Sequence, residues 1–98
     1  MKELLAKLAQ SDKVVTTVLQ KGTHFKVLAL AFKAGMVFPK HQTKQPAKLI
    51  VLEGNVTYEE ENGQSVALDQ YDEHPIPVNI PHWVTAHQPS LCLLIIGE

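Results

Sequence analysis

The sequence contains no arginine, one cysteine and one tryptophan in 98 residues, and each scarcity excludes a class of structure or function. Without arginine, the chain lacks the planar guanidinium group that grips phosphate and carboxylate groups at two points. Together with a net charge of −1, this absence argues against nucleic-acid binding. The single cysteine excludes a disulfide within the chain and is typical of a reducing compartment.

Long hydrophobic runs are also missing, although 45% of the residues are apolar, as in an ordinary globular protein. The opening segment, MKELLAKLAQ, mixes lysine and glutamate with its leucines and lacks the apolar core of a signal peptide. No segment reaches the length that crosses a membrane. We therefore expect a cytoplasmic protein without membrane partners, folded as one domain over residues 1–98.

Basic residues are absent from the second half of the chain. All nine lysines lie within residues 1–48, whereas eight of the ten acidic residues lie within residues 49–98. This separation predicts that strands from the two halves pair, so that opposite charges meet on the outer surface. A polar surface that associates with itself is the alternative.

The pattern of apolar residues predicts one short helix followed by many short strands. Leu4, Leu5 and Leu8 have helical spacing, which places a helix within residues 1–11. Turn signals then recur every 6 to 12 residues, and no strand–helix alternation appears. This predicts an all-β sandwich or barrel. The expected strands are 13–20, 24–33, 48–52, 55–59, 64–68, 74–77, 82–87 and 91–96.

Two stretches combine a histidine with residues that favour turns. Residues 35–54 open with Gly35, reach His41 six positions later and close with a Val-Leu-Glu-Gly turn at Gly54. Residues 71–86 place Pro77 and Asn79 shortly before His82. Asparagine tolerates the left-handed backbone region nearly as glycine does, so both stretches predict tight turns next to strands.

These stretches resemble the two motifs of the cupin superfamily, which are small β-barrels built as double-stranded jelly rolls. The first cupin motif is G(X)5HXH(X)3,4E(X)6G. Here Gly35, His41 and Gly54 match it, Thr43 stands at its second histidine, and Ala47 stands at its glutamate.

The second cupin motif is G(X)5PXG(X)2H(X)3N. Pro77 and His82 match it, whereas Tyr71, Asn79 and Ala86 replace its two glycines and its asparagine. The resemblance implies a jelly-roll barrel with a short N-terminal helix, paired as a homodimer as many small cupins are.

The resemblance also implies a pocket lined by His41, Thr43, Gln45, Ala47 and His82. In metal-binding cupins the two histidines and the glutamate of the first motif join the histidine of the second on one divalent metal. Only His41 and His82 remain here, whereas a catalytic zinc site has three protein ligands, and non-haem iron needs a carboxylate beside two histidines.

Three interpretations of His41 and His82 stay open. They bind one divalent metal (Zn, Fe, Mn or Ni), with water, Gln45 or His74 completing the shell. They line a metal-free pocket as hydrogen-bonding or acid–base groups. Or they are structural and bond to the backbone. The missing ligands favour a module that binds a small polar molecule, and the alternative is a metal-dependent dioxygenase or isomerase.

Other chemically distinctive residues receive simpler predictions. We expect His74 at the surface or a strand end, and Trp83 outside the barrel because it alternates with His82. Tyr58 and Tyr71 are predicted to lie in the core or to wall the pocket. Cys92 lies within the apolar segment LCLLII, so we expect a buried and unreactive thiol.

Overall fold

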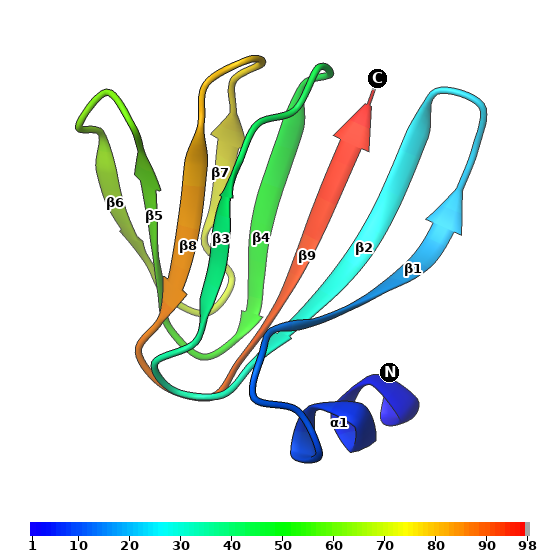
Figure 1. The fold of residues 1–98 in the computed structure, drawn as a ribbon. Helices are drawn as coiled ribbons and strands as arrows, with labels where there is room; N and C mark the ends of the chain where they lie inside the picture. Colours follow the sequence, from blue (N-terminus) through cyan, green and yellow to red (C-terminus); the bar gives the residue numbers. More distant parts are fainter. Residues whose placement is uncertain (98) are drawn as a thin grey trace.

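A computed structural model describes residues 1–97 and shows two antiparallel sheets facing each other, with one helix at the N-terminus (Figure 1). The five-stranded sheet has the order β1-β2-β9-β4-β7, and the four-stranded sheet has the order β3-β8-β5-β6. This confirms the prediction of an all-β jelly roll with a short N-terminal helix. The elements are α1 (Lys2–Ala9), β1 (Val15–Lys21), β2 (Phe25–Phe32), β3 (Val37–His41), β4 (Ala47–Glu53), β5 (Val56–Glu60), β6 (Ser65–Leu68), β7 (Glu73–Ile76), β8 (His82–Ala86) and β9 (Ser90–Gly97).

The main core lies between the two sheets, because each strand points alternate side chains inward. On β8, for example, His82, Val84 and Ala86 are buried, while the residues between them are half-buried. The buried hydrophobic members of this core are Leu30, Phe32, Leu49, Val51, Val56, Tyr58, Leu68, Ile76, Val84, Ala86, Cys92 and Leu94. Cys92 is fully buried as predicted, and burial raises the pKa of its thiol to about 12.

Helix α1 covers the outer face of the five-stranded sheet, below β1 and β2 in Figure 1. Its Leu4 packs on Ala29 and Ala31 of β2, whose small side chains let the helix approach closely. The Nζ of Lys33 donates to the carbonyl of Ser11 at 2.8 Å, just past the helix C-terminus, where a positive charge is favourable. Among residues 1–97, no helix has the length and apolar character needed to cross a membrane.

The register joins the two halves of the chain as their charges predict. Two lysines of the first half reach acids of the second: Lys40 pairs with Glu61 at 3.1 Å, and Lys48 with Glu73 at 3.2 Å. Both ion pairs are solvent-exposed, so each contributes at most about 1 kcal/mol to stability.

The turns of the two histidine-bearing stretches share positive φ angles. Gly54 has φ +96°, and a side chain there would collide with Ser90 and the Pro89 carbonyl, so only glycine fits. In the second stretch Tyr71 and Asn79 have φ values of 71° and 58°, although neither is glycine. Tyr71 is 77% exposed, which corrects its prediction as a core or pocket residue: the left-handed backbone turns its ring outward.

Candidate functional site

His41 and His82 meet at one end of the four-stranded sheet. His41 ends β3 and His82 begins β8, and the two residues are directly opposite each other in the antiparallel register. Their ring centroids are 4.3 Å apart, with an interplanar angle of 63°. The edge of the Phe38 ring also approaches His41, with centroids 4.7 Å apart. The predicted convergence of the two motifs is therefore a cross-strand histidine pair.

Backbone carbonyls set the protonation of both imidazole rings. The Nδ1 of His41 lies 2.8 Å from the Pro39 carbonyl oxygen, and the Nδ1 of His82 lies 3.0 Å from that of Ile80. A carbonyl oxygen can only accept, so each Nδ1 carries the hydrogen and donates it. In the neutral ring, each Nε2 then has a free lone pair. The structure thus presents two acceptor nitrogens from adjacent strands.

The Nε2 of His82 has no hydrogen-bond partner. Within residues 1–97, it is the one buried side-chain nitrogen or oxygen atom in this condition, and the residue is 1% exposed. An unpaired buried polar atom costs roughly 1–3 kcal/mol of stability. Burial, supported by the nearby His41, lowers the pKa of His82, whereas the Ile80 carbonyl and Glu60 oppose that shift. The ring is consequently neutral at neutral pH and keeps its lone pair.

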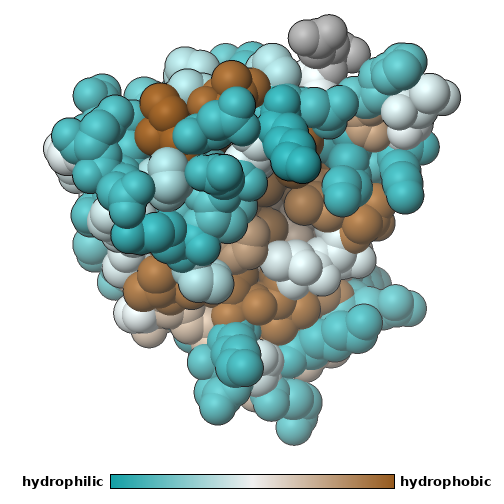
Figure 2. Space-filling model, turned by 45° about the horizontal axis from the view of Figure 1, so that its top comes forward, coloured by the Kyte–Doolittle hydropathy of each residue, from teal (hydrophilic) through white to brown (hydrophobic). Residues whose placement is uncertain are grey.

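A narrow, mostly apolar cleft adjoins this lone pair. Its lining residues are Leu30, Phe38, His41, Leu49, Ile76, His82, Val84 and Leu94, drawn from both sheets. Their side chains close together and leave no room for a water molecule, so water does not satisfy His82 here. On the face shown in Figure 2, hydrophobic surface gathers in a central hollow between largely hydrophilic sides.

A buried carboxylate next to the histidine pair escaped the sequence analysis. Glu60 ends β5, is directly opposite His82 in the register and is 6% exposed. The Tyr58 hydroxyl donates to its carboxylate at 2.7 Å, and the Tyr58 ring stacks obliquely near His82, with centroids 5.6 Å apart. Burial and Glu60 together raise the pKa of Tyr58 well above its usual range. The alternation along β5 was the available signal, since Tyr58 and Glu60 share a face.

His74 also lies closer to this cluster than predicted. It is half-buried near the start of β7, and its ring centroid is 4.9 Å from that of Tyr58; it lies at a strand end, one of the two predicted positions, and not on the open surface. Trp83, in contrast, alternates with His82 as predicted and lies under the Lys40 ammonium, 5.3 Å from its ring centre. The alternation of side chains along the strand therefore predicted the orientation of Trp83 correctly.

Three further residues of the predicted pocket lie beside the cleft and are not part of its lining. Thr43 and Gln45 are in the loop between β3 and β4, where the Thr43 hydroxyl donates to the Gln45 carbonyl at 2.9 Å. Gln45 is exposed, and Ala47 begins β4 and packs against the main core. A contact between these three residues and a ligand stays a prediction.

The donor set does not complete a metal centre. Across residues 1–97, no group of three His, Cys, Asp or Glu side chains converges as metal ligands do. The histidine pair supplies two free Nε2 atoms, whereas a catalytic zinc site uses three protein ligands. The Thr43 hydroxyl donates to a carbonyl, and Ala47 carries no ligand atom. The residues therefore fit half of the metal shell that the resemblance implies.

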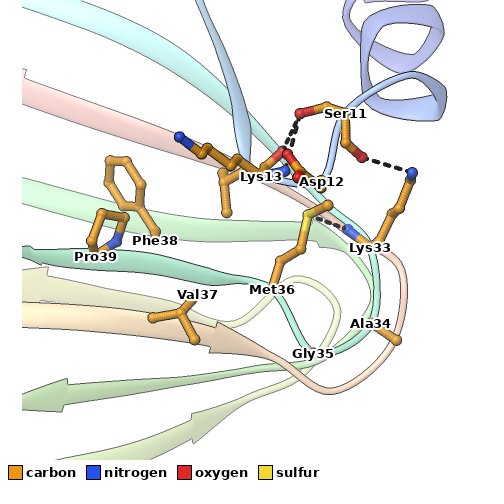
Figure 3. A pocket seen from close by; sticks show the side chains of 11 residues that line it. Ser11, Asp12, Lys13, Lys33, Ala34, Gly35, Met36, Val37, Phe38 and Pro39 are labelled. Carbon is orange, nitrogen blue, oxygen red and sulfur yellow. Dashed lines mark hydrogen bonds between the residues drawn. The ribbon is translucent and has the colours of Figure 1, made fainter.

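A larger groove of about 850 Å³ lies elsewhere, between the segment after α1 and the start of β3 (Figure 3). Some of its polar groups have partners within the chain: the Nζ of Lys33 donates to the carbonyl of Ser11, and the Ser11 hydroxyl donates to the carbonyl of Lys13. The backbone N–H of Lys33 is satisfied by the Met36 sulfur at 3.2 Å. The groove contains neither histidine of the pair, so the histidine-lined cleft is the stronger candidate.

Solved structures share this architecture closely. An RmlC-like cupin from Desulfovibrio desulfuricans matches with a TM-score of 0.80 at 23% identity, over 87% of this chain and 82% of that chain. A cupin superfamily protein from Desulfitobacterium hafniense matches with a TM-score of 0.82 at 15% identity, over 89% and 79%. A Cupin 2 conserved barrel domain protein from Leptotrichia buccalis gives 0.82 at 26% identity, over 91% of this chain and 43% of that one.

Sequence comparison alone gives no match: neither a protein-family model nor a curated protein sequence is significantly similar to the chain. The likeness is thus one of overall structure, carried by the fold of two facing sheets. The chain therefore has the cupin fold and is similar in structure to small RmlC-like, conserved-barrel cupins.

Proposed function

We propose that this protein binds a small molecule in the cleft between the histidine pair and the facing apolar side chains. One observation carries the proposal: the buried Nε2 of His82 is an acceptor without a donor. A ligand that donates a hydrogen bond there removes the cost of the unpaired atom. The apolar lining from Leu49, Ile76 and Leu94 takes up the rest of the ligand.

Entry of such a ligand requires the cleft to open. His41 and Phe38 belong to β3, which is an edge strand of its sheet, and both are only half-buried. Loop residues 42–46, which belong to neither sheet, follow β3 directly. A shift of the Phe38 and His41 side chains thus admits a ligand without disturbing the central strands β8 and β5.

A ligand screen by NMR tests the proposal. Small molecules that carry a donor group and an apolar body are screened against the wild type, His82→Phe and His24→Phe. His82→Phe keeps a ring but removes the acceptor, and His24 is an exposed histidine outside the cleft. Binding compounds are expected to lose about tenfold in affinity with His82→Phe only, since a buried acceptor hydrogen bond is worth roughly that factor. Hits that bind equally to all three proteins contradict the proposal.

A second candidate is a metal-dependent enzyme of the dioxygenase or isomerase kind. The observation in its favour is that both Nδ1 atoms donate to carbonyls and leave Nε2 free, as histidine ligands of metals do. Metal analysis of protein purified without a tag or added metal tests it. Equal, trace amounts of Zn, Fe, Mn and Ni in the wild type and a His41→Ala/His82→Ala variant contradict this candidate.

We also propose that the protein forms a homodimer in the cytoplasm. Support comes from the outer face of the five-stranded sheet, where Leu93 and Ile95 of β9 stay half-buried beside Val27 of β2. A second copy on this face would cover them. Sedimentation that finds only particles of 10.9 kDa at micromolar concentration contradicts the dimer.

A further inference from the structure

The inner face of the four-stranded sheet carries three polar residues in one row. His41 on β3, His82 on β8 and Glu60 on β5 are successive cross-strand partners. Adjacent strands lie roughly 4.8 Å apart, so the row is compact. Its two imidazoles offer lone pairs at Nε2, and its carboxylate offers two acceptor oxygens. This polar row consists of acceptors and lies at the boundary of an apolar core.

The negative charge of the row has no cation beside it. In the part of the chain that the structure describes, the ion pairs are Lys40–Glu61 and Lys48–Glu73, and neither involves Glu60. The Tyr58 hydroxyl supplies one hydrogen bond to the carboxylate, which can accept about four. A buried carboxylate normally has a cation or several donors as partners. Within residues 1–97, the polar row therefore has no ion-pair partner, and the buried Nε2 of His82 has no hydrogen-bond donor.

We propose that the ligand of this cleft carries a protonated amine, and that the polar row is its ammonium site. The inference rests on the proposed ligand-binding function and adds the chemical class of the ligand. An ammonium group has three N–H donors and one positive charge, which match the Nε2 of His82, the Nε2 of His41 and the charge of Glu60. The apolar body of the amine lies against Leu49 and Leu94.

The groups of the row suit an ammonium better than a metal ion. Metal ligands must converge to about 2.0–2.2 Å from one point, and no three side chains within residues 1–97 do so. Charge-assisted N–H···O and N–H···N bonds form at about 2.7–2.9 Å, and a carboxylate also attracts a cation that it does not touch. A neutral His82 is also required, because a protonated ring would repel the ammonium. Burial of that ring supplies this condition.

Three probes with one carbon skeleton test the assignment: 3-methylbutylamine, 3-methylbutanol and 3-methylbutanoate, titrated at neutral pH with EDTA present. Binding is followed by NMR, including the imidazole signals of His82. In the wild type, the amine is expected to bind about tenfold more tightly than the alcohol, because charge-assisted hydrogen bonds are roughly twice as strong as neutral ones. The butanoate is expected not to bind.

The variant Glu60→Gln removes the charge but keeps an oxygen that can accept from Tyr58. Glu60→Gln should reduce the affinity for 3-methylbutylamine to the level of the affinity for 3-methylbutanol. It should leave the affinity for 3-methylbutanol unchanged. The control Glu59→Gln makes the same charge change on the same strand, and Glu59 alternates with the inward-facing Glu60. This control should leave all three affinities unchanged. The comparison of probes on the wild type stands even if Glu60→Gln does not fold.

Two results overturn the amine proposal while ligand binding stands: the alcohol binds as tightly as the amine, or Glu60→Gln keeps the preference for the amine. A third such result comes from a titration with Zn²⁺ or Ni²⁺ alone, without EDTA. If the metal binds in a Glu60-dependent way and the amine does not bind, the cation of this site is a metal. If no probe moves the His82 signals, the amine proposal fails together with the ligand site.

Discussion

The inner faces of the two sheets differ sharply in chemistry, although they pack against each other. The five-stranded sheet contributes an apolar wall of Leu30, Leu49, Ile76 and Leu94 to the cleft. The four-stranded sheet contributes the polar row of His41, His82 and Glu60, with Tyr58 beside it. The five-stranded sheet therefore lines the cleft with apolar side chains only, and the four-stranded sheet carries the polar groups capable of recognition.

Local hydrogen bonds explain why the polar row is tolerated in a small domain. Each imidazole donates to a carbonyl two residues earlier in its own chain segment, and Glu60 accepts from Tyr58 two residues earlier on β5. These bonds form within one strand and its approach, so none of them requires a partner from the opposite sheet. They leave the Nε2 of His82, a residue that lines the cleft, without a hydrogen-bond partner.

The largest expected loss of stability comes from creating a cavity in the apolar wall. Leu49→Ala should lower the free energy of unfolding by about 3 kcal/mol, because it removes a side chain that is 1% exposed and leaves a cavity. Urea unfolding measures this loss. Ile50→Ala is the matched control, since Ile50 points to the outer face of the same strand and is half-buried. Equal losses for both variants would contradict a wall that faces the cleft.

A smaller loss of stability is expected when the hydrogen bond that Tyr58 donates to the polar row is removed. Tyr58→Phe keeps the ring but removes the only side-chain donor that the structure gives Glu60 within residues 1–97, so it should cost about 1.5–2 kcal/mol. Tyr71→Phe, at an exposed tyrosine, should change the unfolding free energy by less than about 0.5 kcal/mol. If Tyr58→Phe is as harmless as Tyr71→Phe, the row is not held by this hydrogen bond.

A gain in stability is expected from a substitution of Tyr71, which lies outside the inner faces of both sheets. Tyr71 has φ 71° in the connection from β6 to β7, and a non-glycine residue in this region is strained. Tyr71→Gly should stabilise the fold by about 0.5–1 kcal/mol, since the relief of strain exceeds the added flexibility of the unfolded chain. Gln70→Gly, next to it without a positive φ, should not stabilise. A change in ligand affinity in Tyr71→Gly would show that the turn is not independent of the cleft.

The smallest expected effect is the contribution of His82 to the pH dependence of the free energy of unfolding. Because burial lowers its pKa in the folded state, the unfolded chain takes up the proton first as pH falls. The stabilising neutral form is thus fully present above the ordinary histidine pKa of about 6.5, and stability is lost as pH falls below it. His82→Phe should weaken this loss between pH 7 and pH 5 in urea titrations, and His24→Phe should not. A stability that rises on acidification through His82 would reverse the sign and contradict its burial.

The sequence predicted the structural features that depend on residues close together along the chain. The turn-forming residues of stretches 35–54 and 71–86 predicted tight turns, and the resemblance of these stretches to the cupin motifs implied a shared pocket for His41 and His82. Alternation predicted that Trp83 points away from His82. The buried Cys92 followed from its apolar surroundings.

The sequence did not predict the features that depend on long-range register. Glu60 falls between the expected strands 55–59 and 64–68, and only the pairing of β5 with β8 places it beside His82. The half-buried position of His74 depends in the same way on its approach to Tyr58 across the barrel. Tyr71 was misplaced because its unusual backbone angle is a property of the folded turn. The polar row could not be assembled without the structure.

The protonation of the His82 ring tests the central claim most directly. Two-dimensional ¹H–¹⁵N NMR at neutral pH, optimised for imidazole nitrogens, distinguishes the hydrogen-bearing nitrogen from the one with a lone pair. The account predicts a hydrogen on Nδ1, a bare Nε2, and a shift of Nε2 when a donor ligand such as the amine probe binds. A hydrogen on Nε2, or a charged ring at neutral pH, would leave the cleft without its acceptor and contradict the account.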